Sequence, residues 1–230
     1  MCIRDRGKAF FNVNLVAIEG LLFTLIVHAA TALSTVVVFR KDIFNILNGL
    51  LQFESNQASN FSLKIILSML PAIVVGLFLE DYINLLFEGN MLLVGSMLLI
   101  TALILFSADR VSIKKKKISY GIALILGAVQ AIAILPGISR SGATVSSAIL
   151  LGIDREKAAR FSFLMVIPLI LGSMVKSITD GSLSEENIAL FPLMIGFVSA
   201  FMTGVFACRW MVALVKKSQL KYFSLSLIHI

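Results

Sequence analysis

The chain has 230 residues, of which 58% are hydrophobic and 14% are charged, and its formal net charge is +7. Soluble globular domains carry about 25% charged residues, so this composition excludes a soluble protein and predicts an integral membrane protein. The positive charge does not indicate a nucleic-acid-binding protein, because the lysines and arginines gather in short segments between apolar runs rather than along one polar face.

Six apolar runs of 16 to 20 residues follow one another along the chain. A helix needs about 20 residues to cross the hydrocarbon core of a membrane, and these runs reach or approach that length. The runs are 21–39, 61–79, 91–106, 119–135, 161–178 and 189–208. We therefore predict an all-α integral membrane protein, a polytopic helical bundle of about six spans that includes a re-entrant broken helix pair. The bundle is expected to form a single domain over residues 7–224.

The two ends of the chain show an unusual relation at the DNA level. The first six residues, MCIRDR, can be encoded by ATG TGT ATA AGA GAC AGN, and the last six, LSLIHI, by CTG TCT CTT ATA CAC ATH. These strings are reverse complements of each other over their shared length, as expected of an adaptor that has been read through into protein. Residues 1–6 and 225–230 are therefore set aside as non-native, and the natural chain is expected to extend beyond both ends.

The distribution of basic residues predicts the orientation of the spans, because lysine and arginine favour the cytoplasmic side in short loops. Four basic clusters are predicted to be cytoplasmic: Arg40 and Lys41; Arg110 and residues 114–117; Arg155, Lys157 and Arg160; and Arg209, Lys216, Lys217 and Lys221. Segments 80–89 and 179–188 contain acidic residues and no basic residue, so they are predicted to be external.

Segment 119–153 lies between two basic clusters, so it has to leave and return to the same side of the membrane. It is too short for two full crossings, since 119–135 has 17 residues and 143–153 only 11. We predict an ingoing helix, a break at Pro136 and Gly137, and a shorter outgoing helix that starts at about residues 142–144. Irregular backbone survives at membrane depth only where protein or a water-filled cavity satisfies its polar groups. The break is therefore predicted to line a cavity that opens toward the external side.

The stretch LPGISRSGAT at 135–144 combines turn residues, hydroxyls and a guanidinium in ten positions. Free backbone N–H groups and the positive end of the helix dipole gather at the start of the outgoing helix, which favours an anion. Arg140 adds a planar cation that matches phosphate oxygens, and Ser139, Ser141 and Thr144 add hydroxyl donors. An arginine inside a membrane costs about 3 kcal/mol and is a functional-site candidate. The sequence therefore predicts an anion site at the break.

Each of these residues also has a structural interpretation. Ser139 or Ser141 can serve to cap the helix, and Arg140 can pair with a carboxylate as a structural strut. Gln130 lies on the ingoing helix, where it either orients a ligand or bonds across to a neighbouring helix. The residues alone leave these alternatives open.

The run PGISRSGAT, followed by AARFSFLMVIPLILG, resembles the bacterial undecaprenyl-diphosphate phosphatase family, which is also known for bacitracin resistance. FTLIVHAATALSTVVVFRKDIF, MLLVGSMLLITALIL and FACRWMVALVKKSQLKYF are similar to successive family segments, so the resemblance covers residues 7–223. It implies hydrolysis of undecaprenyl diphosphate to undecaprenyl phosphate and inorganic phosphate at the external or periplasmic face of the bacterial inner membrane. That reaction recycles the lipid carrier of cell-wall synthesis.

The resemblance also implies roles for single residues and partners. Arg140, Ser139 and Thr144 are the expected catalytic residues, and Gly137, Ser141, Gly142 and Gln130 are expected to contact the substrate. A divalent cation, Mg²⁺ or Ca²⁺, is implied as a cofactor, but the sequence does not identify its ligands. The expected partners are an isoprenoid lipid diphosphate and membrane lipids, with no nucleic acid, and a homodimer is left open.

One family element has no counterpart in this chain. Family members carry an acidic E-G-x-x-E-F-L-P element followed by S-S-x-G-H on an N-terminal hairpin, whereas here Glu19 and Gly20 are followed by LLFTLIV. The acids and the histidine implied for catalysis are thus not among these 230 residues. We expect this chain to bind phosphate weakly and to turn over little substrate or none.

A transporter or flippase of a phosphorylated lipid or anion is the competing interpretation. Secondary transporters also aim the N-termini of broken helices at an anion. Hydrolysis requires a carboxylate or histidine beside the phosphate, and a carrier does not. The residues alone favour neither class, and the resemblance favours hydrolysis.

Overall fold

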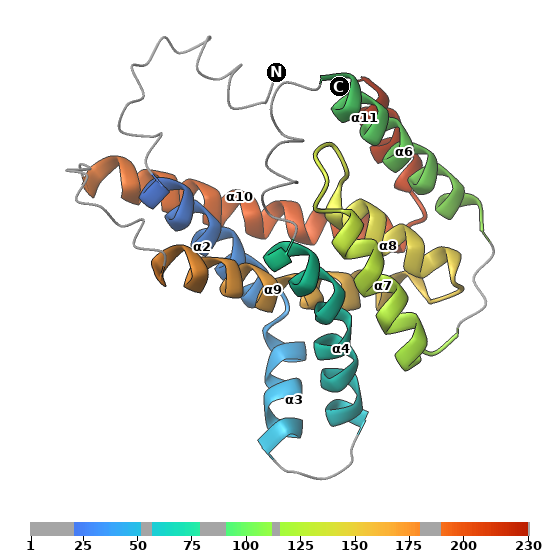
Figure 1. Ribbon diagram of the computed structural model, residues 1–230, viewed down its shortest axis with the longest axis horizontal. Helices are drawn as coiled ribbons and strands as arrows, with labels where there is room; N and C mark the ends of the chain where they lie inside the picture. The colour runs from blue at the N-terminus through green and yellow to red at the C-terminus, as the bar shows by residue number, and fades with distance from the viewer. Residues whose placement is uncertain (1–20, 52–56, 79–90, 112–115, 180–189, 230) are drawn as a thin grey trace. The chain divides into compact units, whose positions relative to one another are not determined.

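The computed structural model describes residues 21–51, 57–78, 91–111, 116–179 and 190–229. These residues form α-helices and one isolated bridge between Lys116 and Ile153. The helices are α2 (Leu21–Val38), α3 (Arg40–Leu51), α4 (Gln57–Phe78), α6 (Met91–Arg110), α7 (Tyr120–Ile132), α8 (Arg140–Leu150), α9 (Arg155–Thr179), α10 (Leu190–Lys216) and α11 (Leu220–His229) (Figure 1). The predicted all-α class is confirmed. Residues 1–6, the acidic segments 80–89 and 180–188, and lysines 114 and 115 lie outside the described residues.

The described helices include four that are long and apolar enough to cross a membrane: Ser59–Gly76, Met91–Arg110, Arg155–Lys176 and Leu193–Lys216. Two shorter apolar helices, Leu25–Val38 and Tyr120–Ile132, account for the two remaining predicted runs. Large apolar side chains on these helices face outward, among them Leu92, which is 89% exposed. The protein is a multi-pass helical membrane protein, since such surfaces are stable only against lipid or another apolar surface.

The chain divides into two compact units. The first comprises Met1–Val38 and Ile170–Ala207, and the second Phe39–Leu169 and Cys208–Ile230, so α9 and α10 have residues in both. Within the first unit, a Cβ added to Gly204 on α10 would lie 2.5 Å from Oγ of Ser34 on α2. Small residues of this kind allow helices to approach closely inside a membrane.

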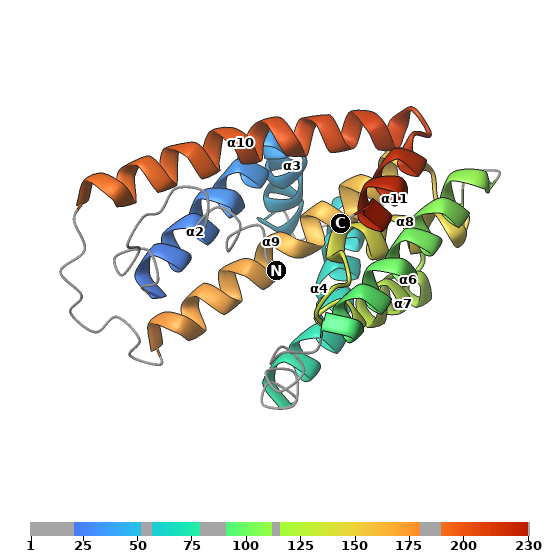
Figure 2. The same ribbon diagram turned by 90° about the horizontal axis from the view of Figure 1, so that it is seen from above.

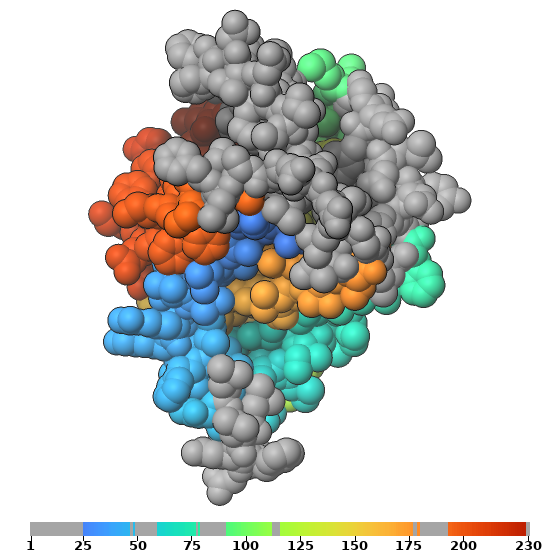
Figure 3. All heavy atoms as spheres, turned by 90° about the vertical axis from the view of Figure 1, so that its left-hand side faces the viewer, coloured from blue at the N-terminus to red at the C-terminus, as the bar shows by residue number. Residues whose placement is uncertain are grey.

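Within the second unit, α4 lies beside α3 and also contacts α7 (Figures 1 and 3). The contact between α4 and α7 depends on Gly127, because a Cβ at this position would lie 2.2 Å from the carbonyl oxygen of Ser68. The backbones of the two helices are therefore nearly in contact at this point. This contact holds α7, the ingoing helix of the predicted broken pair, against a full-length span.

On the other side of the broken pair, α6 contacts α8 and α11 (Figure 2). Ser224 on α11 donates a hydrogen bond of 2.7 Å to the carbonyl oxygen of Ala102 on α6. Asp109, near the end of α6, accepts from Nη1 of Arg155 at 3.5 Å and from the backbone N–H of Leu220 at 3.2 Å. One carboxylate thus ties the end of α6 to the starts of α9 and α11.

Two helices differ from the sequence-based expectation. Helix α3 lies where only a basic cluster at Arg40 and Lys41 is predicted, and its apolar residues recur at the three- and four-residue spacing of an amphipathic helix. Helix α11 continues through residues 225–229, which are predicted to be non-native. Its start is capped by Asp109, a contact between residues 111 positions apart that local sequence does not reveal. The proposed domain boundaries remain predictions.

Candidate functional site

Helices α7 and α8 form the predicted broken pair and lie side by side (Figure 1). The N–H of Lys116, before α7, donates a 3.0 Å hydrogen bond to the carbonyl oxygen of Gly152, after α8. The outer ends of the two helices therefore meet, which confirms that the segment turns back to the place where it began. With 13 residues, α7 is about 20 Å long at 1.5 Å per residue, shorter than the roughly 30 Å core of a membrane.

The break follows Ile132, as a series of turns that end in Gly137. Gly137 has a φ of +91°, a conformation that side chains with a Cβ rarely adopt. A Cβ at this position would also lie 2.5 Å from the carbonyl oxygen of Val94 on α6. Backbone geometry and the close approach of α6 thus account for this glycine. Its predicted contact with substrate stays a prediction.

Helix α8 starts at Arg140, earlier than the predicted start at residues 142–144, and this corrects the expected boundary. The reason is the cap: Oγ of Ser139 accepts a 3.2 Å hydrogen bond from the N–H of Gly142, and its carbonyl oxygen accepts from Ala143 at 2.8 Å. A Cβ on Gly142 would lie 2.9 Å from Oγ of Ser139. The capping interpretation of Ser139 is confirmed, and its hydroxyl proton is not used by the cap.

The first turn of α8 presents a set of donors that the described chain leaves unused. The backbone N–H groups of Arg140 and Ser141, the Ser141 hydroxyl and the Arg140 guanidinium make no hydrogen bond or ion pair with any residue that the structure describes. Both side chains are partly buried. The strut interpretation of Arg140 requires a carboxylate, and none among the described residues reaches it. What remains is a cation and several N–H and O–H donors at the positive end of a helix, which suits an anion.

Thr144 lies one turn further along α8 and is fully buried. Its hydroxyl donates to the carbonyl oxygen of Arg140 at 2.9 Å, so its single proton is engaged with the backbone. In this arrangement Thr144 holds the first turn of α8, and its predicted role as a phosphate ligand stays untested.

Thr101 on α6 belongs to the site, and sequence reasoning did not find it. Its Oγ1 accepts from the backbone N–H of Ser139 at 3.4 Å and donates to the carbonyl oxygen of Met97 at 2.9 Å. Thr101 is fully buried, and it positions the cap of α8 from a neighbouring helix. The sequence feature that could have indicated Thr101 is a hydroxyl residue within the apolar run 91–106.

Gln130 lies on α7, two residues before the helix ends, and is fully buried. Neither polar atom of its side chain has a hydrogen-bond partner in the described part of the chain, so the predicted bond to a neighbouring helix is not observed there. A buried amide without partners costs about 1–3 kcal/mol for each unsatisfied group. The carboxamide is therefore available to a group that the described residues do not supply.

The described residues do not form a site for the implied divalent cation. No group of three or more His, Cys, Asp or Glu side chains that could hold a metal ion is found among them. The backbone N–H groups and the guanidinium at the start of α8 have no lone pair to offer a cation, and the hydroxyls there are neutral oxygen atoms without a carboxylate beside them among the described residues. No chemical step is assigned to a metal, and the requirement for Mg²⁺ or Ca²⁺ stays an expectation.

Comparison of the sequence with known proteins identifies the family of this chain. The family described as "Bacitracin resistance protein BacA" matches residues 7–230. The chain belongs to this family. The match includes the residues of α7, the break and α8, and the suspected resemblance is confirmed.

Curated relatives cover most of the chain. A protein of Christiangramia forsetii named undecaprenyl-diphosphatase is 55% identical over 221 residues, which cover 96% of this chain and 84% of the relative. A protein of the same name from Bacteroides thetaiotaomicron is 42% identical over 95% of this chain and 84% of its own length. Another, from Methanococcus vannielii, is 36% identical over 85% of this chain and 77% of its own length.

Proposed function

We propose that the site at the start of α8 serves the hydrolysis of undecaprenyl diphosphate to undecaprenyl phosphate and inorganic phosphate, the activity that recycles a cell-wall lipid carrier and confers bacitracin resistance, and that this chain alone turns over little substrate or none. The observation that carries the proposal is the Arg140 guanidinium at the first turn of α8, which no described residue pairs with, in a member of the BacA family. The Christiangramia forsetii relative named undecaprenyl-diphosphatase, which is 55% identical over 96% of the chain, supports hydrolysis over transport.

The arrangement suggests how the reaction proceeds. The terminal phosphate of the lipid diphosphate would lie at the start of α8, with its oxygens bound by the N–H groups of Arg140 and Ser141 and by the Arg140 guanidinium. Water would attack the terminal phosphorus, the bond from that phosphorus to the bridging oxygen would break, and the bridging oxygen would leave with undecaprenyl phosphate. The oxygen of the water and one of its protons stay on the released inorganic phosphate, and the other proton passes to bulk water. Arg140 would neutralise the negative charge on the transferring phosphoryl group, a contribution of about 3 kcal/mol or more in such sites.

We also propose the membrane in which the protein lies and the side on which its site opens. The outer ends of the α7–α8 pair carry Lys116 and Lys117 before α7 and Lys157 and Arg160 just after α8, and basic ends favour the cytoplasm. The break would then open toward the external or periplasmic side of a bacterial inner membrane. The isoprenoid tail would extend along the exposed apolar faces of the neighbouring helices.

The test is phosphate release from undecaprenyl diphosphate in detergent micelles, with Mg²⁺ or Ca²⁺ added and with EDTA in a parallel sample. Two proteins are compared: this chain, and a chimaera that begins with the N-terminal segment of the Christiangramia forsetii relative. Arg140→Ala is made in both, and Arg209→Ala, which removes an exposed arginine of α10, is the matched control. We expect little or no release from this chain and measurable release from the chimaera, in which Arg140→Ala should lower the rate by about 100-fold or more and Arg209→Ala should leave it unchanged.

The same samples separate a phosphatase from a carrier. Equilibrium binding of the lipid diphosphate is measured for each protein beside the rate. Binding that depends on Arg140 without phosphate release from either protein would overturn hydrolysis and support a flippase. A chimaera that is active with or without Arg140 would overturn the assignment of the site.

A further inference from the structure

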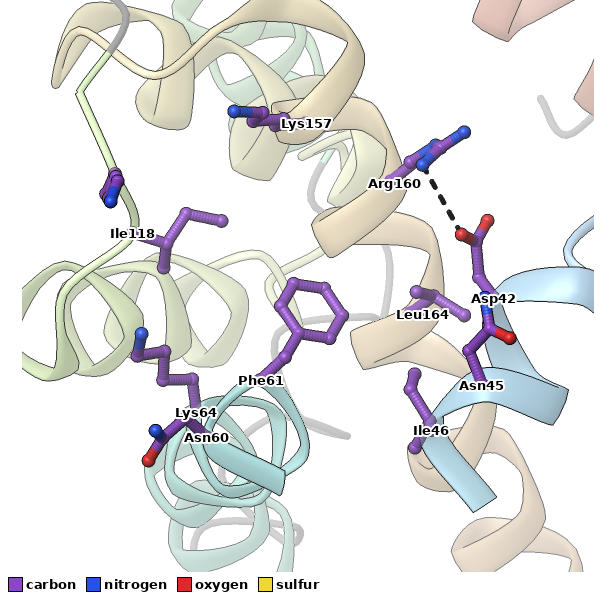
Figure 4. Close-up of a pocket in the computed structure, with 11 residues that line it drawn as sticks. Asp42, Asn45, Ile46, Asn60, Phe61, Lys64, Ile118, Lys157, Arg160 and Leu164 are labelled. Atoms are coloured by element: carbon purple, nitrogen blue, oxygen red, sulfur yellow. Dashed lines mark ion pairs between the residues drawn. The ribbon is translucent and has the colours of Figure 1, made fainter. Parts of the chain in front are cut away.

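The second unit contains a cavity of about 630 Å³ that is separate from the break (Figure 4). Residues of α3, α4 and α9 and the segment before α7 line it: Asp42, Asn45, Ile46, Asn60, Phe61, Lys64, Lys117, Ile118, Lys157, Arg160 and Leu164. Lys117 and Ile118 come directly before α7, and Arg140 lies beyond the far end of this helix. Because α7 is about 20 Å long, the cavity and the predicted phosphatase site lie at opposite ends of the broken pair.

The cavity has a strong positive charge. Lys64, Lys117, Lys157 and Arg160 line it, with Asp42 as the one carboxylate among the lining residues. Arg160 pairs with Asp42 at 3.4 Å and with Glu156 at 3.4 Å. In the part of the chain that the structure describes, the three lysines form no ion pair with a carboxylate. Three ammonium groups around one cavity therefore have no internal counter-ion among the described residues.

Two of the four cations, Lys64 and Arg160, contact neighbouring side chains. Nζ of Lys64 lies 5.2 Å from the centre of the Tyr120 ring, and the Tyr120 hydroxyl donates to Oδ1 of Asn60 at 2.9 Å. The Arg160 guanidinium is turned toward α3 by its ion pair with Asp42 (Figure 4). The mutual repulsion of these groups is relieved when an anion enters, which favours a ligand with negative charge.

The cavity also has an apolar part. Ile46, Phe61, Ile118 and Leu164 are among its lining residues, and the ring of Phe61 lies between α4 and α9 (Figure 4). Beside the cavity, α4 exposes Leu63 and Ile66, which are 53% and 52% accessible and lie on a helix long enough to cross the membrane. A ligand that is anionic at one end and apolar at the other matches this lining better than a free inorganic anion does.

We propose that this cavity binds the phosphate headgroup of an anionic phospholipid, on the side of the membrane opposite to the break. Basic pockets between the ends of membrane helices bind such headgroups through lysine and arginine while the acyl chains remain in the bilayer. The lysines contact the phosphate, and the apolar residues contact the glycerol and the first methylene groups. This site does not depend on hydrolysis at Arg140.

The test uses the full chain in detergent and native mass spectrometry. Phosphatidylglycerol and phosphatidylcholine with the same acyl chains are titrated separately, and the bound fraction is measured for each. We expect phosphatidylglycerol to bind on the order of tenfold more tightly, and Lys64→Gln with Lys157→Gln to remove that difference. The matched control is Lys217→Gln with Lys221→Gln, which makes the same charge change at exposed lysines outside the cavity and should leave the preference intact.

Two further measurements distinguish loss of lipid binding from loss of folding, and a bound lipid from free phosphate. Lys64→Arg with Lys157→Arg retains the cations, so it should retain the preference even if the glutamine pair fails to fold. Equal binding of the two lipids, or equal loss in the cavity and control variants, would overturn the proposal. Millimolar inorganic phosphate should not displace the bound lipid, and displacement would show instead that the cavity binds free phosphate.

Discussion

At the scale of single residues, some residues of the turn between α7 and α8 set its backbone shape, and another carries its charge. Gly137 supplies a backbone conformation and a close approach to α6, while Ser139 caps α8. Arg140 has neither role, because no described residue pairs with its guanidinium. The residues that build the turn thus leave its one cation available for a ligand.

Gly137→Ala tests the shape of the turn. Alanine would have to adopt the positive φ of this position, which is strained for a residue with a Cβ, and its Cβ would overlap the carbonyl oxygen of Val94. We therefore expect a loss of about 2 kcal/mol or more in the free energy of unfolding. Thermal unfolding in detergent gives the measurement. Gly121→Ala is the control, because a Cβ there meets nothing within 4 Å and should leave the unfolding temperature the same or slightly higher. Equal unfolding temperatures in the two variants would contradict the turn geometry.

Ser139→Ala and Ser139→Asp separate the cap from the anion site. Alanine removes the cap at a cost of about 1 kcal/mol, and aspartate restores it. Aspartate also places a negative charge beside Arg140, so we expect Ser139→Asp to be as stable as the unmodified chain but to bind lipid diphosphate at least about tenfold more weakly. Thermal unfolding and equilibrium binding give the two values. Undiminished binding by the aspartate variant would argue against an anion at the start of α8.

At the scale of helices, close contacts at a few positions hold the broken pair between full-length spans. Gly127 allows α7 to approach α4, and Thr101 connects α6 to the cap of α8. Asp109 ties α6 to both α9 and α11, and its ion pair with Arg155 is largely buried, with side-chain exposures of 11% and 7%. These contacts explain how a short re-entrant pair keeps a defined position without crossing the membrane.

Asp109→Ala is expected to be strongly destabilising, because the buried Arg155 guanidinium loses its carboxylate and keeps only its bond to the backbone carbonyl of residue 109, and because the cap of α11 is removed. We expect a loss of about 3 kcal/mol or more in the free energy of unfolding. Adding Arg155→Leu should recover part of that loss, since the unpaired buried charge is then gone. Chemical denaturation of the two single variants and the double variant measures the coupling, and strictly additive losses would show that the two side chains do not interact.

At the scale of the whole molecule, the arrangement of charge gives the broken pair two chemically different ends. The basic cavity lies beside the start of α7, and Arg140 lies beyond its other end. Under the proposed orientation the first faces the cytoplasm and the second the external side.

Cysteine labelling tests that orientation in intact cells. Ser141→Cys and Lys157→Cys are made separately in a background with Cys2→Ser and Cys208→Ala, and both are exposed to a thiol reagent that does not cross membranes. We expect Ser141→Cys to react in intact spheroplasts and Lys157→Cys to react only after permeabilisation. The reverse pattern would invert the topology and would place the proposed phosphatase site in the cytoplasm.

The sequence by itself determined the all-α membrane class, the positions of the spans and the broken pair with Arg140 at its centre. These follow from local properties: the length of an apolar run decides whether it can cross the membrane, and Pro136 followed directly by Gly137 favours a break, whereas a single proline does not end α4 at Pro71 or α9 at Pro168. The motif PGISRSGAT also led to the family that the comparisons confirm.

Only the tertiary structure decided which of the motif residues are free to bind a ligand. It showed that Ser139 caps α8, that the Thr144 hydroxyl donates to the backbone, and that the Arg140 guanidinium has no partner among the described residues. It also brought Thr101 to the site and gathered Lys64, Lys117 and Lys157 around one cavity. Such arrangements join residues tens of positions apart, and they depend on how helices pack in space, which no local pattern of residues specifies.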